Sequence, residues 1–253
     1  MPARLPLFQD LPQSLTLVRH AESLGNVADR AAREAGADRL ELDVRDADVD
    51  LSDNGARQAE SLGRWFTSVA SDSRPDVIIS SPYQRAHRTA LITLGDSGVE
   101  VTVDERLRER DLGLFDGLTG QGIRSGYAEE AARRKKLGKF YYQPPYGESW
   151  ADVVLRVRSL LADLRTGFGG ARIWMFTHQA VIMSFRYVLE GMDETRLLEI
   201  DSEVTIGNVS LTTYEQKDGE LVLTSFADDS VVREGEAQVT QEPTVADEAE
   251  QPT

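Results

Sequence analysis

The sequence SLTLVRHAES, at residues 14–23, predicts a buried strand that ends in charged side chains. Residues 14–18 form a short, mostly apolar and partly β-branched run, which is the pattern of such a strand. The run ends directly at Arg19 and His20. A cation and an imidazole at the carboxyl end of a strand are typical of α/β proteins, in which ligands bind at that edge of a parallel sheet.

Two further apolar runs, at residues 77–79 and 173–176, are followed by polar side chains in the same way. The first ends in a Ser-Ser pair, and the second ends in a threonine and His178. Because the carboxyl ends of parallel strands meet at one edge of a sheet, we expect His20 and His178 to converge there.

Helical and strand patterns alternate along the rest of the chain. Helices are predicted at residues 55–69, 82–94, 123–142 and 149–164 and from His178 to about residue 189, a strand at 99–103, and a hairpin at 205–214 and 220–226. The Gly-rich residues 106–122 are predicted to form an irregular loop. This alternation predicts a single three-layer α/β domain, with a mostly parallel central sheet and helices on both faces.

The composition excludes several classes of function. The chain has 253 residues and a formal net charge of −15, which argues against binding to nucleic acid or to an anionic membrane, because both attract Lys and Arg. It has no apolar run long enough for a membrane helix, and its first residues lack the apolar core of a signal peptide, so we expect a cytoplasmic protein. Cys is absent, which excludes disulfides and thiolate chemistry.

The acidic charge is unevenly distributed. Residues 227–253 contain eight Asp or Glu and a single Arg, with few apolar side chains and no periodicity. This composition is typical of a disordered, solvated segment. We therefore expect a folded domain at residues 1–226 and an acidic, disordered tail at residues 227–253.

The side chains near the two strand-end histidines are basic. Arg19 precedes His20, and Arg85 begins the helix after the strand at residues 77–79. A metal site needs at least three convergent ligands, and neither histidine has a carboxylate directly next to it. Cationic neighbours attract anions, so the pattern predicts an oxyanion or phosphate site with no metal. The third histidine, His87, falls inside a predicted helix and is expected to be structural.

Six segments occur in an order that is specific as a set. They are LVRHAES at residues 17–23 with Asn26, LSDNGARQA at 51–59, SSPYQRAHRTA at 80–90, LRERDLG at 107–113, GESWADVVLRV at 147–157 and THQAVI at 177–182. Together they resemble the signature of the histidine phosphatase superfamily, the phosphoglycerate-mutase-like proteins. The resemblance spans about residues 14–225 and implies that fold, with residues 1–226 as the catalytic domain.

The resemblance implies a role for each matching residue. His20 would accept the phosphoryl group in a phosphohistidine, and Arg19 and Arg85 would bind the phosphate. His178 would be the second histidine of the phosphate pocket, and in its protonated form it would share in neutralising the transition state together with the two arginines. This chemistry requires no metal and no cofactor.

The resemblance also identifies Glu109 as the proton donor for the leaving oxygen. On the residues alone, Glu105, Asp111 and Asp116 in the same loop are equal candidates for that role. The remaining pocket residues are expected to be Ser23, Asn26 and Gln179.

The expected function is a metal-independent phosphomonoesterase that acts on a small-molecule phosphate ester. The run HQAV at residues 178–181 is similar to the fructose-2,6-bisphosphatase branch, whereas cofactor-dependent mutases usually carry H-G-N at the second histidine. A cofactor-dependent phosphoglycerate mutase and a non-catalytic phospho-ligand scaffold are the alternatives. Residues 28–50 and 120–146 are expected to set the specificity, and the resemblance allows a homodimer.

Overall fold

The computed structural model describes residues 11–235 and 237–241. Its strands form one sheet in the order β3-β2-β4-β1-β5-β6. The strands are β1 (Ser14–Arg19), β2 (Val77–Ser80), β3 (Val101–Val103), β4 (Arg172–Thr177), β5 (Leu211–Lys217) and β6 (Glu220–Asp228). Strands β1 to β4 pair in parallel, while β5 pairs antiparallel with both β1 and β6. The predicted mostly parallel sheet is confirmed.

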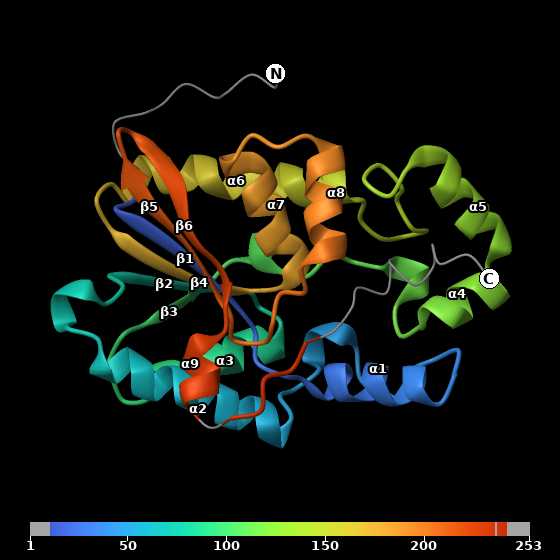
Figure 1. Cartoon of the computed structure of the whole chain (residues 1–253), viewed down its shortest axis with the longest axis horizontal. Helices are drawn as coiled ribbons and strands as arrows, with labels where there is room; N and C mark the ends of the chain where they lie inside the picture. The colour runs from blue at the N-terminus through green and yellow to red at the C-terminus, as the bar shows by residue number, and fades with distance from the viewer. Residues whose placement is uncertain (1–10, 236, 242–253) are drawn as a thin grey trace.

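Helices cover both faces of this sheet (Figure 1). One face carries α6 (Trp150–Gly167), α7 (Gln179–Leu189) and α8 (Glu194–Glu203), and the other carries α2 (Asp53–Ser68), α3 (Gln84–Leu94) and α9 (Ser230–Glu234). Three helices lie beyond the carboxyl ends of the parallel strands: α1 (Leu24–Glu34), α4 (Gly120–Gly126) and α5 (Ala128–Leu137). The molecule is therefore the predicted three-layer α/β domain.

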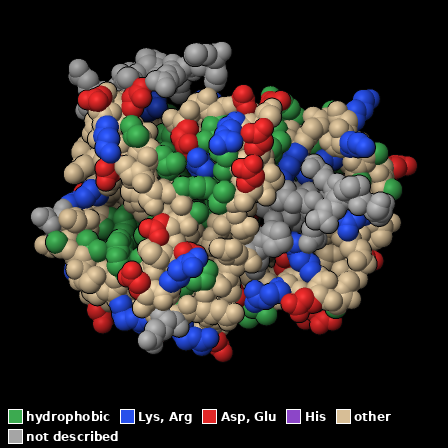
Figure 2. Space-filling view, viewed as in Figure 1, with side chains coloured by type: hydrophobic (Ala, Val, Ile, Leu, Met, Phe, Trp, Pro, Cys, Tyr) green, Lys and Arg blue, Asp and Glu red, His purple; other side chains and the backbone are tan. Residues whose placement is uncertain are grey.

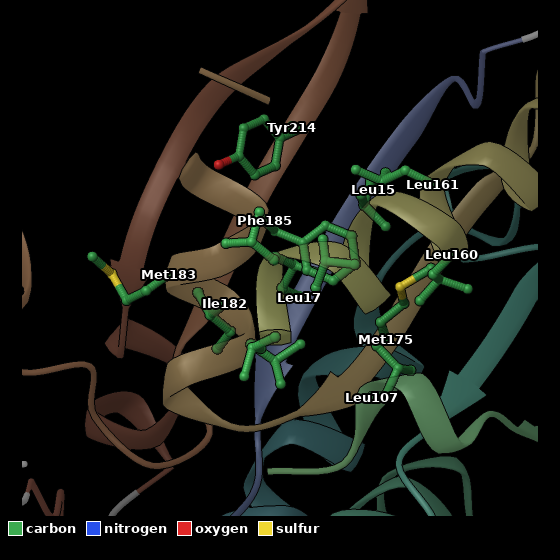
Figure 3. Close-up of a cluster of buried hydrophobic side chains, with 14 of the residues drawn as sticks. Leu15, Leu17, Leu107, Leu160, Leu161, Met175, Ile182, Met183, Phe185 and Tyr214 are labelled. Atoms are coloured by element: carbon green, nitrogen blue, oxygen red, sulfur yellow. The ribbon is translucent and has the colours of Figure 1, made fainter. Parts of the chain in front are cut away.

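Two apolar clusters hold the layers together. The cluster in Figure 3 joins the sheet to α6, α7 and α8 and includes Leu17, Met175 and Phe185. The second cluster joins the opposite face to α2, α3 and α9 and includes Phe66 and Phe176. Successive side chains of a strand point to opposite faces, which is why the neighbours Met175 and Phe176 belong to different clusters. Each fully buried side chain of this size contributes about 1.5–3 kcal/mol.

Some elements differ from the sequence prediction. Residues 123–142 form parts of two helices rather than one, because Tyr127 has φ −137° and ends α4 before α5 begins. Helix α4 begins at Gly120, inside the predicted loop, because the Thr119 side chain accepts a hydrogen bond from the backbone N–H of Gly122. The sequence pattern does not predict α8, which buries few side chains.

The acidic C-terminal segment begins inside the fold. Helix α9 buries Val231 and Val232 against the cluster of α2 and α3, and Thr240 is also buried. The prediction that the folded part ends at residue 226 and that disorder follows is therefore wrong for residues 227–235 and 237–241. The two valines provide the apolar anchor that overall composition does not reveal. The rest of that prediction, residues 236 and 242–253, lies outside the described residues.

The surface carries charges of both signs. Acidic and basic side chains are interspersed over the face in Figure 2. Several form local ion pairs, such as Arg45 with Asp48 at 2.7 Å and Arg233 with Asp229 at 2.6 Å. In the described ranges, none of the helices combines the length and the apolar character needed to cross a membrane.

Candidate active site

A cavity of about 600 Å³ lies at the carboxyl end of β1, next to the segment at residues 39–49. It is lined by most of the predicted site residues, namely Arg19, His20, Ser23, Asn26, Arg85, Glu109 and Gln179. His178 is fully buried against His20, with 5.0 Å between the two ring centroids. His87 is not part of the cavity lining. The structure thus brings together the side chains that the sequence predicts to converge.

His20 is neutral and has one ring nitrogen available. Its Nδ1 lies 2.8 Å from the carbonyl oxygen of Ala21, so Nδ1 carries the proton and donates it to that oxygen. The lone pair is then on Nε2. Burial lowers the pKa of His20 well below its ordinary value, and the positive charges of Arg85 and Arg19 lower it further. The ring is therefore a potential nucleophile at neutral pH.

The side chain of Ser81 contacts the second histidine. Its Oγ accepts a hydrogen bond from the backbone N–H of Tyr83 at 3.2 Å and lies 2.9 Å from Nε2 of His178. We assign the hydroxyl proton to the bond with Nε2, which places the His178 proton on Nδ1. Nδ1 is buried and has no hydrogen-bond partner among the described residues. A neutral His178 can therefore donate one N–H bond to an anion.

In the unliganded site, His178 is in an environment that disfavours the protonated form expected for the transition state. Burial lowers the pKa of His178 well below its ordinary value, and the charge of Arg85 lowers it further. Two arginines and a cationic imidazole would repel one another without an anion between them. A bound phosphate dianion opposes this repulsion, so protonation of His178 is coupled to ligand binding.

The two predicted phosphate-binding arginines are held differently. The Nη1 group of Arg19 donates to the carbonyl oxygen of Ile206. Arg85 is paired with Asp46, through Nη1 to Oδ1 at 2.9 Å and Nη2 to Oδ2 at 3.2 Å. Its Nη1 also donates to the backbone oxygen of Asp46 at 2.7 Å. The Asp46 carboxylate therefore binds the same guanidinium group that, according to the resemblance, would bind the phosphate.

Glu109 has the environment of a general acid. It lines the cavity, and burial raises the pKa of its carboxyl, although the backbone N–H of Arg110 donates to Oε1 at 2.8 Å and opposes the shift. Glu105 does not line the cavity. Asp116 does line it, and burial raises the pKa of its carboxyl as well, so Asp116 is a matched comparison for Glu109.

The three remaining predicted pocket residues make local contacts. Ser23 and Asn26 form the capping box of α1: the Ser23 Oγ accepts from the Asn26 N–H at 3.1 Å, and the Asn26 Oδ1 accepts from the Ser23 N–H at 2.8 Å. Gln179 donates to Asp201 of α8 at 3.4 Å. All three line the cavity while holding its walls in place.

Sequence reasoning misses the support for the loop after β1. The side chain of Asn208 donates to the carbonyl oxygen of His20 at 2.9 Å and accepts from the hydroxyl of Thr240 at 2.9 Å. Next to it, Val209 has φ 59°, a strained conformation for a β-branched residue, and donates its N–H to the Arg19 oxygen at 3.1 Å. These contacts bring residues about 190 positions apart together, and no local pattern reveals them.

Among the described residues, no three His, Asp or Glu side chains form a group that could hold a metal ion. The charges that lower the pKa of His20 are those of Arg85 and Arg19. Such a site can bind an oxyanion, present an imidazole nitrogen to it and supply a proton from a carboxyl group.

Comparisons with known proteins show which family the chain resembles. The model of the histidine phosphatase superfamily, branch 1, matches residues 15–229. Phosphoserine phosphatase 1 of Hydrogenobacter thermophilus is 31% identical over 180 residues, which are 71% of this chain and 77% of that protein. The 6-phosphofructo-2-kinase/fructose-2,6-bisphosphatase of Arabidopsis thaliana is 29% identical over 171 residues, which are 68% of this chain but only 20% of that relative.

A solved structure with the same fold is that of a mycobacterial glucosyl-3-phosphoglycerate phosphatase in complex with VO3. The two proteins are 25% identical in sequence and superpose with a TM-score of 0.65. The superposition covers 85% of this chain and 99% of the phosphatase chain. The similar proteins include both phosphatases and mutases. One of the mutases is a 2,3-bisphosphoglycerate-dependent phosphoglycerate mutase of Methylorubrum populi. It is 27% identical over 159 residues, which are 61% of this chain and 74% of that protein.

Proposed function

Because the chain belongs to the histidine phosphatase superfamily, we propose that it is a metal-independent phosphomonoesterase that hydrolyses a small phosphorylated metabolite through a phosphohistidine on His20. The observation that carries the proposal is the neutral His20 ring, whose Nδ1 proton is held by the Ala21 carbonyl at 2.8 Å. That hydrogen bond leaves the Nε2 lone pair for attack on phosphorus.

In the first step, Nε2 of His20 attacks the phosphorus and the bond to the ester oxygen breaks. Protonated Glu109 gives its proton to the departing alkoxide, a transfer that its raised pKa favours. The guanidinium groups of Arg19 and Arg85 and the Nδ1–H of His178 bind the equatorial oxygens, where the transition-state charge is spread.

In the second step, a water molecule attacks the phosphorus and the bond to His20 breaks. The Glu109 carboxylate takes a proton from this water and returns to the acid form, while phosphate leaves. Atoms and protons balance over the two steps: one ester and one water give one alcohol and one phosphate. The coupled protonation of His178 compensates the charge of the phosphoryl group in both steps.

The first test measures phosphate release from p-nitrophenyl phosphate with EDTA present. The second treats the phosphorylated enzyme with acid or with alkali and uses mass spectrometry to find which treatment removes the phosphoryl group and which residue carries it. We expect release that EDTA does not affect, an alkali-stable, acid-labile phosphohistidine on His20, and loss of both in His20→Ala. His87→Ala is the matched control, because His87 does not line the cavity. Loss of activity with EDTA would contradict the proposal. Isomerisation of 3-phosphoglycerate that depends on 2,3-bisphosphoglycerate would establish the mutase instead.

A further inference from the structure

A largely buried ion pair lies behind the loop that carries Glu109. Its members are Glu148, which precedes α6, and Arg156, which is part of that helix. Nε of Arg156 donates to Oε1 of Glu148 at 3.1 Å, and Nη2 donates to Oε2 at 3.2 Å. The two side chains are 9% and 14% exposed, and neither lines the cavity. Such a bidentate pair fixes the orientation of both side chains.

The guanidinium of Arg156 also binds the backbone of residues 106–111, here called the acid loop. Nη1 donates to the carbonyl oxygen of Arg106 at 2.5 Å, and Nη2 donates to the carbonyl oxygen of Glu109 at 3.3 Å. Because a guanidinium presents its N–H groups in a rigid planar fork, it holds these two oxygens in fixed relative positions. Arg156 therefore binds the main chain of the proton donor itself.

Glu148 binds the acid loop through different groups. Its Oε1 accepts a hydrogen bond from Nη2 of Arg108 at 2.6 Å, and its Oε2 accepts one from the backbone N–H of Asp111 at 3.1 Å. The backbone N–H of Glu148 donates in turn to the Asp111 oxygen at 2.8 Å. The pair thus contacts the acid loop before Glu109, at Glu109 and after it, so a shift of the pair would displace the Glu109 carboxyl.

Arg156 acts on the Glu109 carboxyl through its charge as well. Burial raises the pKa of Glu109, and the positive charges of Arg85 and Arg156 oppose this rise. The charged and titratable groups that face this carboxyl are Tyr83 and Arg85 at the start of α3, Asp46 of the segment at residues 39–49, Arg110 of the acid loop and Arg156 of α6. Removing the charge of Arg156 should raise the pKa of Glu109 further, whereas changing only the shape of the cation should not.

We propose that Glu148 and Arg156 are positioning residues that hold Glu109 in place for proton transfer. The inference rests on the proposed phosphatase function, because it links the pair to the proton donor of that reaction. A general acid works only within hydrogen-bond reach of the leaving oxygen. A displacement of about 1 Å at such a group can cost about 10²-fold in rate. The contacts to the acid loop keep that displacement small.

The main variant is Arg156→Lys, which keeps the charge but cannot form the planar fork. It should lower kcat for p-nitrophenyl phosphate by about 10- to 100-fold, because turnover needs Glu109 as the acid and then as the base. Inhibition by inorganic phosphate should stay as in wild type. In the Glu109→Gln background, the same substitution should lower kcat no further, because the pair acts through Glu109.

A pH profile separates the charge of Arg156 from its shape. Arg156→Met removes the positive charge that opposes the raised pKa of Glu109. The fall of kcat with rising pH should therefore move to higher pH in Arg156→Met. It should stay near the wild-type position in Arg156→Lys, where the positive charge remains. A fall at the wild-type pH in both variants would contradict this part of the proposal.

Arg186→Lys is the matched control. Arg186 of α7 forms a bidentate pair with Glu190, through Nε to Oε1 at 2.7 Å and Nη2 to Oε2 at 2.9 Å. Its side chain is 7% exposed and does not line the cavity. Arg186→Lys should lower the melting temperature about as much as Arg156→Lys does, yet leave kcat and its pH profile unchanged. Equal kcat values for these two variants would overturn the proposal.

Failure of the positioning role and failure of the proposed function have different signatures. An enzyme that releases phosphate through His20, but in which Arg156→Lys lowers kcat by the same factor with and without Glu109→Gln, remains a phosphatase and lacks the positioning role. A chain that releases no phosphate loses both. If neither Arg156 variant folds, Glu148→Gln, which keeps one acceptor oxygen but removes the charge, provides the same comparison in both backgrounds.

Discussion

At the scale of single residues, the proton on Glu109 controls the proposed reaction. Glu109→Gln should lower kcat by about 10²- to 10⁴-fold, because the general acid is lost. Inhibition by inorganic phosphate should be unchanged, since the arginines remain. Glu109 must be protonated to serve the leaving oxygen, and burial raises its pKa above the ordinary carboxyl value. Wild-type kcat should therefore fall as the pH rises through that pKa, and a pH profile of the variant should lack this fall.

Asp116→Asn is the control for this prediction, because Asp116 lines the same cavity and also has a raised pKa. It should keep both turnover and the fall of kcat with rising pH. If Asp116→Asn removes that fall and Glu109→Gln does not, the two acids have exchanged roles.

Asp46 provides a second prediction at this scale. Its carboxylate occupies both Nη groups of Arg85, so a phosphate must displace it. Removing the charge with Asp46→Asn should tighten competitive inhibition by inorganic phosphate by about two- to five-fold, as expected for a partly exposed ion pair. Asp48→Asn removes the same charge two residues away and should have no such effect, because among the described residues Asp48 pairs only with exposed Arg45. Weaker inhibition in Asp46→Asn would show that Asp46 orients Arg85 instead.

These residues differ in how well sequence predicts them. Arg19, His20 and His178 end or follow buried strands, so the apolar runs and the parallel topology place them together. Asp46, by contrast, reaches Arg85 from the short 3-10 helix Asp46–Asp48, 39 residues earlier in the chain. Its position depends on tertiary packing, which no local spacing encodes.

At the scale of elements, the N-terminus of α2 is packed against the loop after β1. A Cβ on Gly55 would lie 1.9 Å from the carbonyl oxygen of Glu22, which also accepts the N–H of Ser52 at 2.9 Å. Gly55→Ala should therefore push the loop that carries His20 and destabilise the fold by about 1–3 kcal/mol, as overpacking does. Thermal unfolding measures the stability, and p-nitrophenyl phosphate turnover should fall with it.

Gly167→Ala is the matched substitution, because Gly167 is in α6 and a Cβ there meets no atom within 4 Å. Replacing this glycine should leave stability unchanged or raise it slightly. Equal melting temperatures for Gly55→Ala and wild type would show that the loop adapts to the methyl group.

The elements themselves follow closely from the sequence where burial is strong. The strands at 14–18, 77–79 and 173–176 are predicted within one residue at each end of β1, β2 and β4, because both faces of these strands are buried. The prediction misplaces the ends of α5, which buries none of its residues, and it misses α8. Their ends depend on capping and tertiary contacts rather than on an apolar stripe.

At the scale of the whole molecule, residues 237–241 support the loop after β1 from a distant part of the chain. The side chain of Gln58 accepts the Glu22 N–H at 2.8 Å and donates to the Gln238 oxygen at 2.7 Å and to the Thr240 hydroxyl at 3.0 Å. The same hydroxyl donates to Asn208, whose amide holds the His20 carbonyl. Thr240 thus connects two supports of the loop. Composition alone indicates only a solvated acidic tail there.

Thr240→Val tests this connection, because it keeps the shape of the side chain and removes its hydroxyl. The buried Asn208 and Gln58 side chains would each lose a partner, so we expect a loss of about 1–3 kcal/mol of unfolding free energy in urea. A lower kcat should accompany it, because the loop that carries His20 loses support. Thr166→Val, at an exposed position where the hydroxyl donates to the Asp163 carbonyl oxygen within α6, should change neither. Wild-type stability and turnover in Thr240→Val would mean that the β1 loop is held independently of the C-terminal segment.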